Sequence, residues 1–486
     1  MNLTMRTTVL LRSLNTALLA AGVLSGCAFT PTYERPATPA PAAFKELQGW
    51  APAAPGDALE RGPWWNLFGD PVLDGLVRQV EVSNQNVAAA VAAYGQARAI
   101  VAEQRAALFP SVTLSGGANR NGSGGGSNNN GSNDNSNGRT SNNYRLNIGS
   151  SWEPDVWGRL RAGVSVAQAN AQASAADLAS ARLSAQGELA ADYFSLRSVD
   201  AQRALLATTI EGYQRVLKIT QNRFDVGIVP HSDVYQAQTQ LASAQSDDLT
   251  LARQRAQFEH AIAVLVGKAP ADFALATVPW NVTVPEVPVG VPSTLLERRP
   301  DIAASERAVA AANAQIGIVR AAYFPQIGLT ASYGPSASAI GDLFKASSVA
   351  WALGLSATET IFNGGANRAA VQGANAAREQ AVARYRQTVL TAFADVEDQL
   401  AATRVLAQQQ DLQRQASQAA DKVEEQVLNR YKAGQVSYSE VVQAQVTALN
   451  ARRALVQTQG NRQTTAVALI QSLGGGWHAD QLTAQE

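Results

Sequence analysis

The chain has 486 residues with 39 basic and 39 acidic side chains, so its formal net charge is zero. Charged residues make up 16% of it, below the roughly 25% of an ordinary soluble domain, and this balance excludes a basic surface for nucleic acid. With a single cysteine, an internal disulfide and a cysteine metal site are excluded as well.

The first 26 residues have the features of a cleaved export signal. Arg6 and Arg12 precede an apolar run, residues 14–24, that is too short to span a bilayer as a mature helix. Leu24-Ser25-Gly26-Cys27 then resembles a bacterial lipobox, in which the cysteine is acylated and becomes the first mature residue. We therefore expect a covalent lipid on Cys27; the alternative is a buried structural thiol.

A tether and then a helix are expected next. Residues 27–70 are rich in proline and alanine, which favours an extended, loosely packed, acylated tether. Asp70-Pro71 has the pattern of an N-cap followed by a first-turn proline, and apolar residues then recur at helical spacing. We predict a helix from Pro71 to Leu108.

Four segments alternate apolar and polar residues, as β-strands do. They start at Val112, Tyr144, Ile327 and Val349. The last three are close to the ~10 residues that cross a bilayer as a tilted strand, although a strand of a soluble sandwich has the same pattern. Residues 116–143, almost wholly Gly, Asn and Ser, predict a mobile loop between the first two strands.

Two pairs of long helices follow the strands. No proline lies between Pro154 and Pro230, and none follows Pro335. Apolar stripes at helical spacing run through both stretches: Leu206, Ile210, Tyr213, Leu217 and Phe224 in the first, and Val382, Tyr385, Val389, Phe393, Val396 and Leu400 in the second. These stripes predict coiled-coil seams.

The sequence is a tandem duplication. Asn222-Arg223-Phe224-Asp225-Val226-Gly227 returns 207 residues later as Asn429-Arg430-Tyr431-Lys432-Ala433-Gly434, and Phe109-Pro110 returns as Phe324-Pro325. The glycine that closes each longer signature suits the left-handed residue that ends a helix, and Ser437 to Glu440 matches a capping box that begins the next helix. Each signature is therefore predicted to be the tip of a helical hairpin.

The duplication divides the mature chain into two repeats. We expect the first repeat over residues 71–269 and the second over 301–473. A proline-rich linker at 270–300 joins them, and a C-terminal tail occupies 474–486. Each repeat is expected to contain a helix, a β-hairpin and a long helical hairpin.

Four spanning strands cannot close a membrane barrel. The smallest such barrels have about eight strands, and an open edge in lipid leaves backbone groups unpaired. The barrel must therefore be shared between copies of the chain. Two copies give about eight strands with a filled interior, whereas three give about twelve and leave room for a lumen.

Several motifs together resemble the outer membrane factors, the TolC-like and OprM-like exit ducts of tripartite efflux pumps, and most closely their NodT-type lipoprotein branch. The motifs are the lipobox ending at Cys27, Trp65 with Phe68-Gly69-Asp70-Pro71, Leu295-Leu296-Glu297-Arg298-Arg299-Pro300-Asp301-Ile302, Phe324-Pro325, and Arg430-Tyr431-Lys432-Ala433-Gly434 with Ala444-Gln445. The resemblance covers essentially the whole mature chain. It implies an α+β membrane fold: a trimeric, twelve-strand outer-membrane β-barrel, with four strands per subunit, continuous with a periplasmic α-helical coiled-coil barrel.

The resemblance also implies a channel and not an enzyme. In such a system an inner-membrane RND transporter and a periplasmic adaptor deliver small molecules, such as drugs, to a homotrimer seated in outer membrane lipid. A type I protein secretion duct is the alternative, and a structural coiled-coil surface lipoprotein is a more distant one. The three histidines are scattered and no catalytic motif is present, so we expect no catalytic residue, no metal site and no cofactor besides the lipid on Cys27.

The resemblance places adaptor docking at the hairpin tips and a periplasmic gate beside them. The expected docking residues are Val226, Gly227, Ile228, Ala433, Gly434 and Gln435, and the gate candidates are Asp233, Tyr438, Glu440, Val442 and Gln443. Relatives tend to carry Asp where this chain has Gln443, and a neutral amide forms no salt bridge. The gate here is therefore expected to use hydrogen bonds or packing around Tyr438 and Val442. Asp233 and Glu440 are either luminal charges or carboxylates that complement a helix dipole.

Overall fold

The structure, a computed structural model, describes residues 29–38, 41, 43–46, 63–122, 140–287 and 295–479. The predicted signal segment, Cys27 and the end of the C-terminal tail lie outside the described residues. The chain forms two compact units: Met1–Pro36, Gly95–Ala171 and Glu306–Ala383 in the first, and Ala37–Tyr94, Gln172–Ser305 and Arg384–Glu486 in the second. No helix in the described ranges is both long and apolar enough to cross a membrane.

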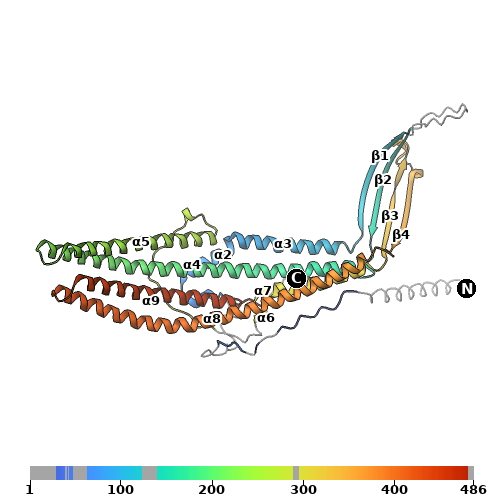
Figure 1. Cartoon of the computed structure of the whole chain (residues 1–486). Coiled ribbons are helices and arrows are strands. Elements are labelled where there is room, and N and C mark those ends of the chain that lie inside the picture. Colours follow the sequence, from blue (N-terminus) through green and yellow to red (C-terminus); the bar gives the residue numbers. More distant parts are fainter. Residues whose placement is uncertain are drawn as a thin grey trace, which may run out of the picture. The chain divides into compact units, whose positions relative to one another are not determined.

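The first unit contains one antiparallel sheet. Its strands lie in chain order, β1 (Ser111–Gly122), β2 (Thr140–Trp152), β3 (Gln326–Ala337) and β4 (Val349–Thr358), as Figure 1 shows. The four predicted strands are thus confirmed. On β4, the alternate side chains Trp351, Leu353 and Leu355 are 73%, 76% and 74% exposed, which is the pattern of a strand that faces lipid.

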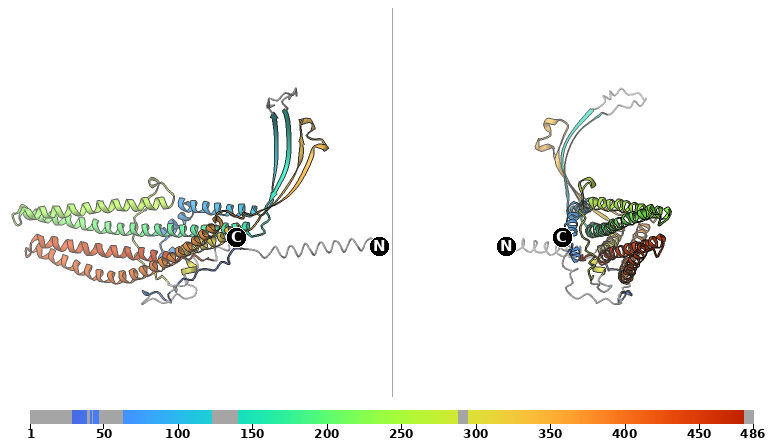
Figure 2. Two further views of the ribbon diagram at one scale, coloured as in Figure 1. Left: turned by 45° about the vertical axis from the view of Figure 1, so that its right-hand side comes forward. Right: turned by 90° about the vertical axis from the view of Figure 1, so that its left-hand side faces the viewer.

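The predicted loop at residues 116–143 is too long. Residues 116–122 continue β1 and residues 140–143 begin β2, and the two strands run side by side (Figure 2). Gly122 is paired with Thr140. Strand pairing uses main-chain donors and acceptors, so a segment of small polar side chains can join a sheet without burying apolar surface. The rest of the expected loop, residues 123–139, lies outside the described residues.

The first helix begins as predicted. It is α2 (Pro71–Ser83), and it follows a short 3-10 turn, η2 (Trp64–Phe68). The Asp70 carboxylate accepts hydrogen bonds from the main-chain N–H groups of Val72 at 2.9 Å and Leu73 at 3.2 Å, which confirms the N-cap.

The predicted continuation to Leu108 is wrong, because the helix breaks at Asn84. A separate helix, α3 (Gln85–Ala106), starts there. The Asn84 side chain accepts from the N–H groups of Asn86 at 2.9 Å and Val87 at 3.1 Å, so it caps the new helix. Asparagine competes in this way with helix continuation, and apolar spacing alone does not reveal it.

The helices of the two repeats have equal lengths. α4 (Arg159–Asp225) and α8 (Ala366–Lys432) have 67 residues each, and α5 (His231–Leu265) and α9 (Tyr438–Ser472) have 35. All four keep the 207-residue offset. Helices α3 and α7 (Pro300–Ala321), with 22 residues each, start 215 residues apart, at 85 and 300. From α3 and α7 onward, the described helices therefore place the difference in length between the repeats in the β-hairpin segment, which precedes α4 and α8.

Within the second unit, two apolar clusters join the helical hairpins α4/α5 and α8/α9. One comprises Val199, Leu206, Tyr213, Ala244, Leu251 and Leu449, and the other Val216, Ala237, Tyr431, Tyr438 and Val441. Each cluster contains residues of both repeats. The two predicted stripes are buried in large part: Leu206, Tyr385, Val396 and Leu400 are all 0% exposed.

The linker between the repeats packs against the second unit's helices. Trp280 donates from Nε1 to Gln463 Oε1 at 2.8 Å, and Gln463 Nε2 donates to the Asn281 carbonyl at 2.6 Å. Arg197, whose side chain is 2% exposed, donates to the Ala276 carbonyl at 2.8 Å. Buried polar side chains of α4 and α9 thus satisfy the carbonyl groups of an extended segment.

Residues 29–36 lie along α7, although the sequence predicts a loosely packed tether. The Phe29 ring stacks on Phe324 with centroids 4.2 Å apart. Asn313 donates from Nδ2 to the Pro31 carbonyl at 2.7 Å, and the Tyr33 hydroxyl donates to the Glu306 carboxylate. The segment is extended, as its prolines favour, but side-chain contacts hold it in place.

Candidate adaptor-docking tips and gate

Each helical hairpin turns at a glycine in the left-handed region. We call residues 222–230 tip 1 and residues 429–437 tip 2. Gly227 in tip 1 has φ of 73° and Gly434 in tip 2 has φ of 74°. In tip 1 the Ile228 N–H donates to the Arg223 carbonyl and the Gly227 N–H to the Phe224 carbonyl, both at 2.8 Å. These are the crossed bonds of a Schellman motif, and they recur at tip 2.

The predicted docking residues are exposed. In tip 1, Val226 is 69% exposed and Ile228 62%. Ala433, Gly434 and Gln435 of tip 2 are exposed too. Two neighbouring apolar side chains on one turn remain uncovered by the described part of the subunit, so tip 1 presents an apolar contact surface.

The two acidic gate candidates lie in the first turns of their helices. Glu440 accepts from the Ser437 N–H at 3.4 Å and completes the predicted capping box. Asp233 occupies the equivalent first turn of α5. Both positions suit a carboxylate that complements the positive end of a helix dipole.

The remaining gate candidates lie on α9. Tyr438 is 3% exposed, and its ring centroid is 5.5 Å from that of Tyr431. Val442 is partly buried against the same cluster, whereas Gln443 is exposed. Burial raises the pKa of Tyr438 above its ordinary value, so its hydroxyl stays neutral at physiological pH.

One arginine connects the two tips. Arg223 donates from Nη1 to the Tyr431 carbonyl at 2.7 Å, and its guanidinium carbon lies 4.6 Å from the centroid of the Tyr431 ring. The contact combines a hydrogen bond to a helix C-terminal carbonyl with a cation–π interaction. Sequence reasoning missed this role, although Arg223 stands in the duplicated signature; the signature shows that the residue recurs but not what it touches.

A known family matches most of the chain. The profile of the family described as outer membrane efflux protein matches residues 76–268 and 291–475. The chain belongs to this family. The probable efflux pump outer membrane protein TtgC of Pseudomonas putida is 31% identical over 471 residues, covering 96% of each chain. The pyoverdine export outer membrane protein OpmQ of Pseudomonas aeruginosa is 31% identical over 470 residues, covering 96% of this chain and 98% of its own.

The fold of this outer membrane efflux protein is similar to a solved channel structure. The outer-membrane channel OprN superposes with a TM-score of 0.84 at 28% identity, covering 93% of this chain and 100% of OprN. The fold class expected from the sequence, a membrane strand sheet combined with long helical hairpins, is thereby confirmed. Its location is the outer membrane, and its role is that of an efflux channel.

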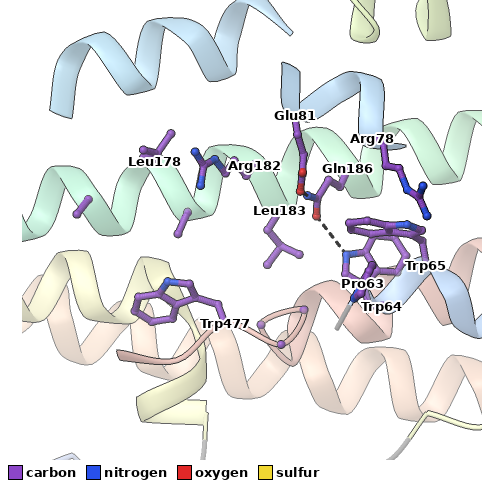
Figure 3. Close-up of a pocket in the computed structure, with 15 residues that line it drawn as sticks. Pro63, Trp64, Trp65, Arg78, Glu81, Leu178, Arg182, Leu183, Gln186 and Trp477 are labelled. Carbon is purple, nitrogen blue, oxygen red and sulfur yellow. Dashed lines mark hydrogen bonds between the residues drawn. The ribbon is translucent and has the colours of Figure 1, made fainter. Parts of the chain in front are cut away.

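The efflux protein also has a cavity that the sequence did not predict. It has a volume of about 610 Å³ and is lined in part by Trp64, Trp65, Arg78, Arg182 and Trp477 (Figure 3). The Trp64 indole donates to Gln186 Oε1 at 3.3 Å, and Gln186 Nε2 donates to Glu81 at 3.0 Å. Residues from near both ends of the chain therefore meet at one place in the second unit.

Proposed function

We propose that this protein forms the trimeric exit duct of a tripartite efflux pump. Within its described residues, the sheet ends in β1 on one side and β4 on the other, each paired on one side only. In lipid such edges must be paired, and pairing β1 of one copy with β4 of the next closes a barrel. Three copies supply about twelve strands, which leave a lumen, whereas about eight do not.

The observation that carries the proposal is the combination of lipid-facing strands with exposed tips on one chain. Trp351, Leu353 and Leu355 are exposed on β4, and Val226 and Ile228 are exposed at tip 1. The tips suit a periplasmic adaptor that couples the duct to an inner-membrane RND transporter. In this arrangement the apolar side chains of tip 1 are buried by the adaptor.

The cargo we propose is small molecules, and the protein catalyses no reaction. OpmQ is named for pyoverdine export and TtgC as an efflux pump component. These names favour small-molecule efflux over type I protein secretion. Gate roles for Asp233, Tyr438, Glu440, Val442 and Gln443 remain part of the proposal.

The proposed lipid anchor is an acyl group on Cys27, and we propose no other cofactor. The lipobox carries this assignment. The stacking of Phe29 on Phe324 supports it, because the chain is held in place two residues after the modified cysteine.

The test is photo-crosslinking in cells from a probe at Asp225, which is exposed in tip 1. A probe at Leu249, 71% exposed on α5, is the matched control. We expect a periplasmic adaptor to be captured from Asp225 and not from Leu249. The double variant Val226→Asp/Ile228→Asp should abolish capture and raise dye accumulation, while Leu249→Asp should do neither.

Two results would contradict the proposal in different ways. Equal capture from both probes, or unchanged capture in the double variant, would exclude docking at tip 1. A wild-type protein that runs as a monomer on native gels would exclude the shared barrel.

A further inference from the structure

One face of α4, in the first repeat, contacts the second repeat and supplies the arginine that donates a hydrogen bond to it. On α4, Val216 and Arg223 are seven residues apart and therefore lie on the same side of the helix. Val216 is 4% exposed in the cluster that contains Tyr431 and Tyr438, and Arg223 donates to the Tyr431 carbonyl. This face of α4 is thus covered by the second repeat of the same chain.

The equivalent face of α8 is exposed at Val423 and Arg430. Val423 and Arg430 stand 207 residues after Val216 and Arg223, and Val423 is 51% exposed. Arg430 is also exposed, and its guanidinium makes no hydrogen bond or ion pair with any residue that the structure describes. The same helix exposes Val405 by 52% and Leu412 by 66%. An apolar stripe with one unpaired arginine therefore runs along α8.

The first repeat carries the equivalents of the two aromatic residues at the acceptor. Phe224 and His231 are the equivalents of Tyr431 and Tyr438, and the ring centroids of Phe224 and His231 lie 4.5 Å apart. Tyr431 is 2% exposed and Tyr438 3%, whereas Phe224 is only partly buried and His231 is exposed. The surface that the first repeat covers on the second thus has a counterpart that is more exposed at Phe224 and His231.

The carbonyl groups at the two tips differ in the same way. The Tyr431 carbonyl accepts two hydrogen bonds, from the Gly434 N–H at 2.9 Å and from Arg223 at 2.7 Å. The Phe224 carbonyl accepts one from the described residues, from the Gly227 N–H at 2.8 Å. A carbonyl oxygen has two lone pairs, so the Phe224 oxygen can accept one more donor.

We infer that Arg430 of each subunit donates a hydrogen bond to the main-chain oxygen of Phe224 of the partner subunit. Its guanidinium also lies over the aromatic ring of that phenylalanine. The inference rests on the proposed closed trimer, in which first and second repeats alternate around the ring. Each second repeat then faces the first repeat of the next copy. Val423 then packs on the partner subunit as Val216 packs within one subunit. The contact of Arg223 with the Tyr431 carbonyl, which we call the clasp, recurs between subunits.

This contact places a cation at the C-terminal end of α4 in the partner. A guanidinium there complements the negative end of the helix dipole as well as the carbonyl lone pair. Its acceptor is a main-chain atom, so the contact depends on the conformation of the turn. The arginine therefore fixes where tip 1 of the partner sits relative to tip 2.

Cysteine crosslinking of the full-length protein in membranes tests the pairing. Arg430→Cys combined with Asp225→Cys is treated with a short bis-maleimide, and Arg223→Cys with Lys432→Cys, the pair related by the duplication, is the matched control. We expect covalent dimers and trimers from the first pair on denaturing gels. The control pair should be linked within one chain and stay monomeric, with the link identified by mass spectrometry.

The failures are distinguishable. If native gels show trimers and the control pair links, but Arg430→Cys/Asp225→Cys stays monomeric, the clasp is overturned and the proposed duct stands. If native gels show no trimer, the proposed function itself fails.

Hydrogen–deuterium exchange gives a second readout. Arg430→Ala should make the amides of tip 1 exchange several-fold faster, although residue 430 belongs to tip 2, and Arg430→Lys should restore only part of the protection because lysine lacks the planar fork. Lys432→Ala, at an exposed neighbour, is the control and should leave tip 1 unchanged. Unchanged exchange at tip 1 in Arg430→Ala would overturn the inference.

Discussion

The Tyr193 hydroxyl donates a hydrogen bond of 2.6 Å to the Asp70 carboxylate, whose other oxygen caps α2. One carboxylate therefore connects the long helix α4 to the first helix of the repeat. Tyr193 is 0% exposed, and burial, followed by the bond to Asp70, raises the pKa of its hydroxyl. The hydroxyl thus remains a hydrogen-bond donor at neutral pH.

Replacing Tyr193 with Phe should lower the free energy of unfolding by about 1–3 kcal/mol, because the Asp70 carboxylate loses a charge-assisted hydrogen bond. Chemical unfolding in detergent measures the change. Tyr235→Phe is the control, since Tyr235 is 57% exposed and its loss of a hydroxyl should be neutral. An unchanged midpoint in Tyr193→Phe would show that this bond contributes nothing.

The helix break at Asn84 predicts a graded loss of stability in two variants of that residue. Asn84 is 4% exposed, caps α3 and donates from Nδ2 to the Leu265 carbonyl at the end of α5 at 2.8 Å. Asn84→Ala should destabilise the protein by about 2–3 kcal/mol, and Asn84→Ser should recover about 1 kcal/mol because serine can still cap. Asn86→Ala, at an exposed neighbour, should be neutral. Equal damage from Ala and Ser would argue against a capping role.

The sequence predicted those features that depend on local pattern. Strand alternation, the Asp70 cap, the Gly227 and Gly434 turns and the Ser437 capping box all follow from residues close together in the chain. The break at Asn84 was missed because apolar spacing does not reveal its cap on Asn86 and Val87, and its other partner, Leu265, is 181 residues away.

Features that depend on distant partners could not be predicted. Residues 116–122 form a strand because β2 pairs with them, not because of their own propensity. The contact of Arg223 with Tyr431 joins residues 208 apart in sequence. The duplication identified both positions, but only the arrangement of the helices shows that one arginine is paired and its equivalent is not.

A glycine in β3 should be essential for the sheet. A Cβ atom on Gly334 would lie 2.0 Å from the main-chain oxygen of Leu146 on β2, so even alanine forces the strands apart. We expect Gly334→Ala to reduce sharply the amount of heat-modifiable oligomer in the outer membrane. Gly117→Ala on β1, with nothing within 4 Å of the added atom, is the control. Normal oligomer yield in Gly334→Ala would refute the close approach of β2 and β3.

A carboxyl group on α4 predicts a pH dependence. Burial, and then the nearby Glu188 carboxylate, raise the pKa of Asp192 from 3.8 to about 6. The folded state binds this proton more tightly than the unfolded state, so Asp192 costs stability as the pH rises from about 4 to about 6. Asp192→Asn should therefore raise the unfolding temperature at pH 7.5 and leave it nearly unchanged at pH 4. Scanning calorimetry at both values, with Glu188→Gln in parallel, measures the difference; an equal shift at both pH values would rule out titration of Asp192.

The equal lengths of α4 and α8 constrain how this gene can change. Removing one residue from a helix shortens it by about 1.5 Å and turns everything beyond the deletion by about 100°. A single deletion in α8 would therefore turn Arg430 to another side of the helix. It would also shift tip 2 along the helix axis relative to tip 1. The change of offset from 215 to 207 arises in the β-hairpin segment and not in these helices. Insertions and deletions should therefore accumulate between the strands, while α4 and α8 keep equal lengths.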